Sequence, residues 1–186
     1  MPARSLLSLG IASLQAQLQR EEWLSVTVVE AQMLRAVEPA DEALLFALFA
    51  EDRAAQLAAA GFGEAQVQAL IAMQYRGRAM TYSAAHPDAD GSVLVGPEGE
   101  AVGYLLLDRK PDRWWIVDIA VLAAHRGRGL GTRVLEECKR RAVAAGAGLQ
   151  LQVSPLNPAR RLYERLGFRN AGEDAVAVQM VWDLAQ

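Results

Sequence analysis

The stretch 113–132 constrains the fold most, because a buried-strand pattern in it leads directly into a glycine-rich turn and a helix. Residues 114–122 are apolar or β-branched except for Asp118, which is typical of a strand covered on both faces. The turn that follows carries three alternating glycines, Gly127, Gly129 and Gly131. The sequence therefore predicts a strand, a tight turn and a helix in succession, and it marks Asp118 as the exceptional residue of the strand.

The glycine-rich turn has the properties of an anion site. Glycines let the backbone approach a ligand closely, and the start of a helix adds unpaired N–H donors with a partial positive charge. We therefore predict a phosphate-binding loop made of Arg126, Gly127, Arg128, Gly129, Leu130, Gly131 and Thr132. The alternative is a tight turn without a ligand, although two arginines and three glycines are more than such a turn requires.

Two familiar phosphate loops do not match this stretch. The dinucleotide pattern Gly-x-Gly-x-x-Gly would place its third glycine at Thr132 or at Val134, and the next predicted strand carries Gln150 and Gln152 instead of an acidic residue. The Gly-Lys-Ser/Thr sequence of a Walker loop is missing as well. Nicotinamide dinucleotides and nucleoside triphosphates are thus disfavoured as ligands.

Composition excludes several other classes of protein. The net charge of -3 argues against a general nucleic-acid binder, which is normally basic. No apolar run is long enough to cross a membrane. Cys138, the single cysteine, requires no oxidising compartment, and His86 and His125 are too few and too widely spaced to form a metal site with it. We expect a cytoplasmic protein without a metal, a nucleic-acid partner or a membrane partner.

Residues 1–32 stand apart from the rest of the chain. A helical stripe runs through Leu6, Leu7, Ile11, Leu14 and Leu18. We expect either an appended helix or translated sequence upstream of a true start at Met33, and a signal peptide is a third interpretation. Residues 33–186 are expected to form one domain.

The remaining pattern predicts a mixed α/β fold. Strands are expected at 33–37, 92–95, 101–107, 114–122, 149–153, 168–170 and 176–182, and helices at 42–53, 64–83, 132–146 and 157–167. Asp41 and Asn157 are predicted to cap the helices that follow them. The first two helices lie away from the phosphate loop in sequence, and they are where specificity for a second substrate could be built. The strands at 114–122 and 149–153 should be parallel, because a helix connects them.

Two motifs resemble those of the GNAT family of N-acetyltransferases. The first is its loop Arg/Gln-x-x-Gly-x-Gly/Ala, matched by Arg126, Gly129 and Gly131. The second spans 157–168 and reads N-x-A-x-x-L-Y-x-x-L-G-F. The resemblance covers 33–184, and it implies a mostly antiparallel sheet, flanked by helices, whose fourth and fifth strands are parallel and splay apart.

The resemblance also implies acetyl-CoA as cosubstrate and an amine as acceptor. The pyrophosphate would bind the amides of 126–132, and the pantetheine would bind main-chain groups of Ile119, Ala120 and Val121. Asn157 would contact CoA. Tyr163 would direct its hydroxyl at the thioester sulfur.

The chemistry of acetyl transfer then assigns roles to two side chains. A phenol with a pKa near 10 suits Tyr163 to protonate the leaving thiolate, although a tyrosine packed in the core is the alternative. Family members often place a glutamate on the fifth strand, where this chain has Gln152, so Asp118 is the remaining candidate for the base. A carboxylate satisfied by Arg113 or by a strand neighbour is equally compatible with the sequence, and a water relay or an acceptor of low pKa would replace a base.

We therefore predict an acetyl-CoA-dependent N-acetyltransferase that works by direct attack in a ternary complex. A cysteine intermediate is disfavoured, because Cys138 lies on the apolar stripe of the helix behind the loop. The alternative is a non-catalytic module that binds or senses acyl-CoA, in which Gln152 marks a lost base.

Overall fold

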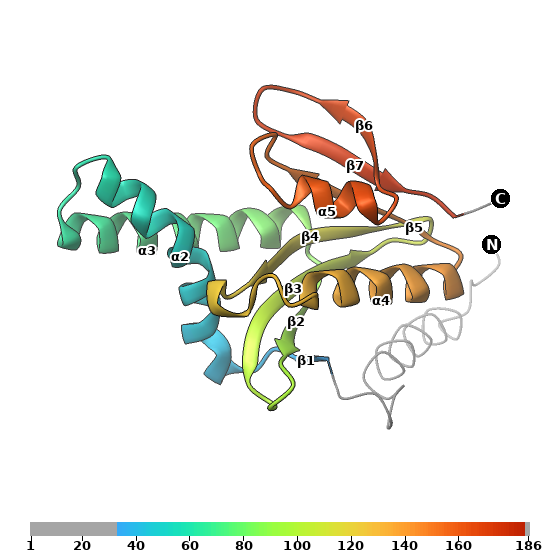
Figure 1. Ribbon diagram of the computed structural model, residues 1–186, viewed down its shortest axis with the longest axis horizontal. Helices are drawn as coiled ribbons and strands as arrows, with labels where there is room; N and C mark the ends of the chain where they lie inside the picture. The colour runs from blue at the N-terminus through green and yellow to red at the C-terminus, as the bar shows by residue number, and fades with distance from the viewer. Residues whose placement is uncertain (1–32, 185–186) are drawn as a thin grey trace, which may run out of the picture.

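The computed structural model describes residues 33–184 and contains a seven-stranded sheet in the order β1-β2-β3-β4-β5-β7-β6 (Figure 1). The strands are β1 (Leu34–Ala36), β2 (Asp90–Val95), β3 (Ala101–Arg109), β4 (Arg113–Val121), β5 (Gly148–Val153), β6 (Arg169–Glu173) and β7 (Val178–Trp182). The helices are α2 (Glu42–Ala59), α3 (Glu64–Ala85), α4 (Leu130–Ala144) and α5 (Arg160–Arg165), with short 3-10 turns η1 (Pro39–Asp41) and η2 (Ala123–His125). The predicted mixed α/β fold is confirmed.

The sheet is antiparallel except between β4 and β5. These two strands pair in parallel only from Arg113 opposite Gly148 to Ile116 opposite Leu151. Beyond Ile116, β4 continues to Val121 without pairing to β5, so the two strands separate. The expected splayed pair is therefore present, and it opens an edge of β4 in the middle of the sheet.

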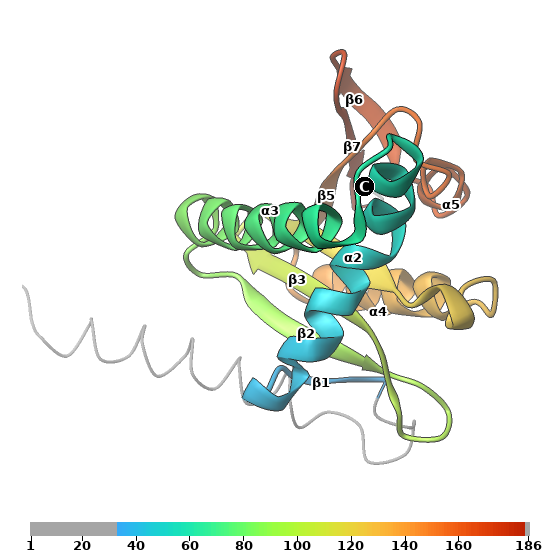
Figure 2. The ribbon, with the colours of Figure 1, turned by 90° about the vertical axis from the view of Figure 1, so that its left-hand side faces the viewer.

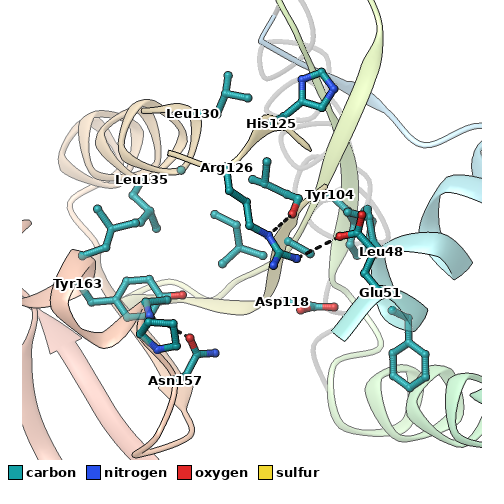
Figure 3. A pocket seen from close by; sticks show the side chains of 18 of the residues that line it. Leu48, Glu51, Tyr104, Asp118, His125, Arg126, Leu130, Leu135, Asn157 and Tyr163 are labelled. Atoms are coloured by element: carbon teal, nitrogen blue, oxygen red, sulfur yellow. Dashed lines mark hydrogen bonds and ion pairs between the residues drawn. The ribbon is translucent and has the colours of Figure 1, made fainter. Parts of the chain in front are cut away.

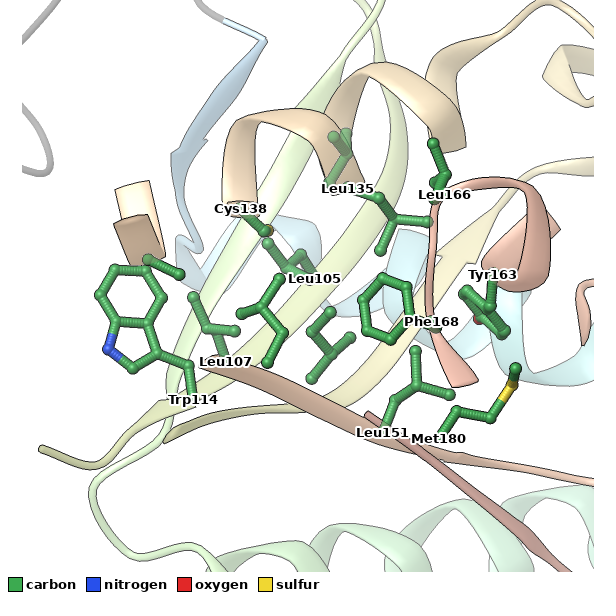
Figure 4. Packing of buried hydrophobic residues seen from close by; sticks show 14 of the residues in the cluster. Leu105, Leu107, Trp114, Leu135, Cys138, Leu151, Tyr163, Leu166, Phe168 and Met180 are labelled. Atoms are coloured by element: carbon green, nitrogen blue, oxygen red, sulfur yellow. The ribbon is translucent and has the colours of Figure 1, made fainter. Parts of the chain in front are cut away.

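Helices cover both faces of the sheet. The main core lies on the α4 and α5 face, where Leu135 and Cys138 of α4 pack against strand residues such as Leu105 and Leu151 (Figure 4). On the other face, α2 and α3 cross the sheet (Figure 2). These two helices share a smaller cluster of buried residues around Phe49 and Ile71. Because side chains alternate along a strand, some pack against α4 and α5 and the others face α2 and α3.

Helix boundaries and caps differ from the sequence prediction. Helix α2 continues to Ala59 instead of ending at 53. Asp41 precedes α2 but makes no side-chain cap for it, because its carboxylate accepts the Glu38 N–H at 2.8 Å and pairs with Arg35 at 2.6 Å. Asn157 does not precede α5 directly either, because a turn comes between them, and its Oδ1 accepts the Ala159 N–H at 2.9 Å. Both side chains stabilise the turn before the helix instead.

The terminal hairpin forms as predicted, with one exception. The last strand begins at Val178 instead of at residue 176, and Val176 lies in the turn before it, 75% exposed. The expectations for 1–32 lie outside the described residues. Between residues 33 and 184, no helix is long and apolar enough to span a membrane.

Candidate active site

A cavity of about 1260 Å³ opens where β4 and β5 separate. Its walls come from the β4 end, the loop before α4, the segment 154–163 and the facing sides of α2 and α3 (Figure 3). All but one of the predicted site residues line it: Asp118, Ile119, Ala120, Val121, Arg126, Gly127, Gly129, Leu130, Gly131, Thr132, Asn157 and Tyr163. The exception is Arg128, which is exposed and does not line the cavity. Residues assigned to separate roles thus meet in one space.

The predicted phosphate loop has an unusual backbone. Gly127 and Gly129 have φ values of 74° and 80°, a left-handed conformation that favours glycine. A side-chain carbon placed on either would meet no protein atom within 4 Å, so both face open space. Leu130 begins α4 and is buried in the main core, which anchors the helix start beside the cavity. The loop therefore presents a helix N-terminus to the cavity from a fixed position.

Glu51 of α2 holds this loop from the other side of the cavity. Its carboxylate accepts the Ala123 N–H at 2.9 Å and pairs with Arg126 at 3.2 Å, and the Arg126 Nε donates to the Val121 carbonyl at 2.7 Å. Sequence reasoning did not find Glu51, because Ala123 and Arg126 lie 72 and 75 residues further along the chain. The contact joins α2 to the predicted phosphate loop.

Asp118 is mostly buried, and its partner is not the expected one. Arg78 of α3 contacts its carboxylate at 2.7 Å, whereas Arg113 pairs with Asp183 at 2.6 Å. Arg113 begins β4 and Asp118 lies near its other end, so at about 3.3 Å per residue their backbones are roughly 15 Å apart, beyond the reach of the Arg113 side chain. Sequence reasoning missed Arg78, which is 40 residues from its partner.

Burial raises the pKa of the Asp118 carboxyl, and the nearby positive charges of Arg78 and Arg53 oppose that rise. Its side chain keeps 16% of its surface exposed, so a substrate in the cavity can reach it. A raised pKa makes a carboxylate a stronger base than in water. Asp118 is thus suited to accept a proton inside the cavity.

Tyr163 is both a core residue and a residue that lines the cavity, the two alternatives considered for it. Its ring packs in the main core, 5.9 Å from Phe168 between centroids, and it also lines the cavity. The phenol extends from α5 toward the side of the cavity that holds Asp118 (Figure 3). Burial, together with the charge of Asp118, raises the pKa of Tyr163 to about 12, so the phenol keeps its proton at neutral pH.

Two other polar residues lie away from the reacting side chains. Gln152 is exposed on β5 and does not line the cavity. Cys138 is fully buried in α4, and burial raises the pKa of its thiol to about 12, which leaves it unreactive. Within residues 33–184, no three His, Cys, Asp or Glu side chains gather closely enough to hold a metal ion.

Comparison with known proteins places this geometry in a family. Residues 44–168 match the model of the acetyltransferase (GNAT) family. Streptothricin acetyltransferase of Streptomyces lavendulae is 36% identical over 98 residues, which cover 50% of this chain and 52% of that protein. L-2,4-diaminobutyric acid acetyltransferase of Virgibacillus pantothenticus is 35% identical over 80 residues, 40% of this chain and 50% of that protein. The chain thus spans about half the length of these curated relatives.

Solved structures share the fold over most of the chain. PaiA N-acetyltransferase from Thermoplasma acidophilum, solved in complex with coenzyme A, has a TM-score of 0.61 at 15% identity, and the match covers 81% of this chain and 98% of that one. An HPA2-related acetyltransferase from Corynebacterium glutamicum has a TM-score of 0.58 at 20% identity, covering 83% of this chain and 97% of that one. At such identities the likeness concerns the fold alone.

Proposed function

Because the chain belongs to the acetyltransferase (GNAT) family, we propose that it transfers an acetyl group from acetyl-CoA to an amine. One observation carries the proposal: a single cavity contains the anion loop, the separated edge of β4, a buried carboxylate and a buried phenol. Acetyl transfer from a thioester to an amine needs these groups, since it requires a diphosphate site, an oxyanion donor, a base and an acid.

The loop and the β4 edge fit the two parts of a CoA molecule. N–H groups of 126–132, beside the start of α4, would bind the diphosphate. Ile119, Ala120 and Val121 lie on the part of β4 that does not pair with β5, so their main chain would bind the extended pantetheine. Asn157 lines the same cavity and would contact CoA there. Acetyl-CoA would thus run from the loop toward Tyr163.

The reaction assigns a role to each group that faces the acceptor. An amine with a pKa near 10.4 is neutral in about one molecule per thousand at pH 7, so Asp118 would accept its proton. Main-chain N–H groups of β4 would stabilise the oxyanion that forms when the amine attacks the acetyl carbonyl. Tyr163 would donate its proton to the sulfur as the carbon–sulfur bond breaks. We propose direct attack in a ternary complex, because buried Cys138 offers no thiolate for an acyl-enzyme.

The alternative was a module that binds acyl-CoA without turning it over, with Gln152 as the mark of a lost base. Gln152 does not line the cavity, whereas Asp118 does, so a carboxylate is present where an amine would bind. This arrangement favours the enzyme. We propose the cytoplasm as its location, because a chain with a single cysteine needs no oxidising compartment.

A thiol-release assay tests the proposed function. The full chain is incubated with acetyl-CoA and a panel of amines, which includes streptothricin and L-2,4-diaminobutyric acid because two relatives bear those names. We expect CoA release that depends on the amine, with a matching acetylated product by mass spectrometry. Tight acetyl-CoA binding without amine-dependent release would support the binding module instead.

Replacing Asp118 tests the assignment of the base. We expect Asp118→Asn to lower kcat about 100-fold or more and to remove the acid limb of the pH–rate profile, since a base works only when deprotonated. In the unmodified protein, activity should fall as the pH falls through the raised pKa of Asp118. Arg78→Gln removes a charge that opposes this rise, so the acid limb should move to higher pH.

Acetyl-CoA affinity, measured by calorimetry, serves as the control for both variants. We expect little change in it, because neither side chain belongs to the anion loop or the β4 edge. A kcat and an acid limb that survive unaltered in Asp118→Asn would remove Asp118 from the mechanism and favour a water relay.

A further inference from the structure

The predicted phosphate loop is anchored to the rest of the fold at both of its ends. Between the two ends, Gly127 and Gly129 give the backbone more conformational freedom than other residues would. At the α4 end, the Gly129 carbonyl accepts the Arg133 N–H at 3.0 Å, and Leu130 is buried in the main core. Helix α4 therefore fixes this end, whereas the other end, at Arg126, is held by a different part of the fold.

Glu51 of α2 is the anchor at the Arg126 end. Its Oε2 accepts the Ala123 N–H at 2.9 Å, and the same oxygen accepts an N–H of Arg126 at 3.2 Å (Figure 3). Arg126 in turn donates from Nε at 2.7 Å to the carbonyl of Val121, the last residue of β4. These bonds join α2, the turn η2 and the end of β4 at the point where the loop begins.

By charge alone, Glu51 should weaken the binding of acetyl-CoA. Its carboxylate lines the same cavity as the loop, so it would repel a diphosphate, and it offsets part of the positive charge of Arg126. Between partly exposed groups, such electrostatic effects change affinity only a few-fold. A hydrogen bond to a charged acceptor contributes about 10-fold. The restraint that Glu51 places on the loop is therefore the larger of two opposing effects.

We infer that Glu51 is a positioning residue for acetyl-CoA, which holds the phosphate loop in its binding conformation before the ligand arrives. The inference rests on the proposed function, since it requires a diphosphate in the loop. Apparent affinity scales with the fraction of molecules whose loop already has the binding conformation. Glu51 acts through the loop, so it affects the affinity for acetyl-CoA and leaves the chemical step unchanged.

Calorimetric titration with acetyl-CoA tests the inference by the sign of the effect. We expect Glu51→Ala to raise the Kd about 10-fold because both bonds are lost, whereas charge alone predicts a lower Kd. Glu51→Gln keeps an oxygen that can accept the Ala123 N–H, so it should restore much of the affinity. The higher Kd of Glu51→Ala should persist at about 1 M salt, which screens charges beyond roughly 3 Å. With a turned-over amine, KM for acetyl-CoA should rise while kcat stays nearly constant.

Amide hydrogen exchange without ligand gives a second measurement. Peptides that cover 123–129 should exchange faster in Glu51→Ala than in the unmodified protein, because one end of the loop is released. Peptides from the middle of α4, at 134–142, should exchange at the same rate in both proteins. Faster exchange in both segments would indicate a general loss of stability and would contradict the inference.

Glu164→Ala is the control variant for both measurements. Glu164 pairs with Arg160 at 3.1 Å, a contact of the same kind, but neither residue lines the cavity. Its Kd for acetyl-CoA and its loop exchange should match those of the unmodified protein. A Kd that is unchanged or lower in Glu51→Ala, or that rises equally in Glu164→Ala, would overturn the inference and leave the proposed function standing. If the unmodified protein does not bind acetyl-CoA at all, the proposed function fails and the inference fails with it.

Discussion

Tyr163→Phe should lower kcat about 100-fold or more while acetyl-CoA affinity changes little. The phenol keeps its proton at neutral pH, because burial and the charge of Asp118 raise the pKa of Tyr163 to about 12. A positioned acid of this kind contributes roughly 10²- to 10⁴-fold to a rate. Phenylalanine preserves the ring that packs against Phe168 in the main core, so the fold should survive. Steady-state kinetics and calorimetric acetyl-CoA titration separate the two quantities.

Tyr75→Phe is the matched control for this experiment. Burial raises the pKa of Tyr75 to about 12 as well, but this tyrosine packs against Phe46 of α2 and does not line the cavity. Its loss of a hydroxyl should leave kcat nearly unchanged. Equal rates for Tyr163→Phe and the unmodified protein would show that Tyr163 is a core residue with no part in proton transfer.

Gly129→Val should raise the Kd for acetyl-CoA about 100-fold or more. The added side chain would meet no protein atom within 4 Å, so it would occupy the open space beside the N–H groups of the loop. Two charge-assisted hydrogen bonds lost at about 1.5 kcal/mol each already correspond to a factor of this size. Isothermal titration with acetyl-CoA measures the effect directly.

Backbone strain is the competing explanation, and Gly99→Val controls for it. Gly129 has a φ of 80°, where a valine is strained by roughly 1–3 kcal/mol. Gly99, in the turn between β2 and β3, has a φ of 84° and equally open surroundings, but it lies outside the cavity. Both variants should lose similar thermal stability, and only Gly129→Val should lose affinity. Unaltered affinity in Gly129→Val would mean that the loop is only a turn.

The sequence predicted the architecture well because the relevant signals are local. Glycine spacing, apolar periodicity and the strand–turn–helix succession at 113–132 depend on neighbours along the chain, and each predicted strand is found in the sheet. The boundaries were less accurate. Asp41 and Asn157 bond within turns that precede the helices, and residue type alone does not distinguish such a turn from a cap.

Chemical environment within the site was harder to predict, as Asp118 shows. The sequence identified it as exceptional, since a carboxylate interrupts an apolar strand. Arg113, one of the partners considered for it, lies at the other end of β4 and pairs with Asp183 instead. The true partner, Arg78, comes from a helix on the far side of the cavity.

The sequence by itself thus determined the order of elements, and it marked the glycine-rich turn, Asp118 and Tyr163 as candidates for the site, because each of these signals lies in residues close together along the chain. Only the tertiary structure decided that these groups share one cavity, that Glu51 holds the loop and that Arg78 pairs with Asp118. The physical reason is that burial and charge at a site are sums over side chains from distant segments.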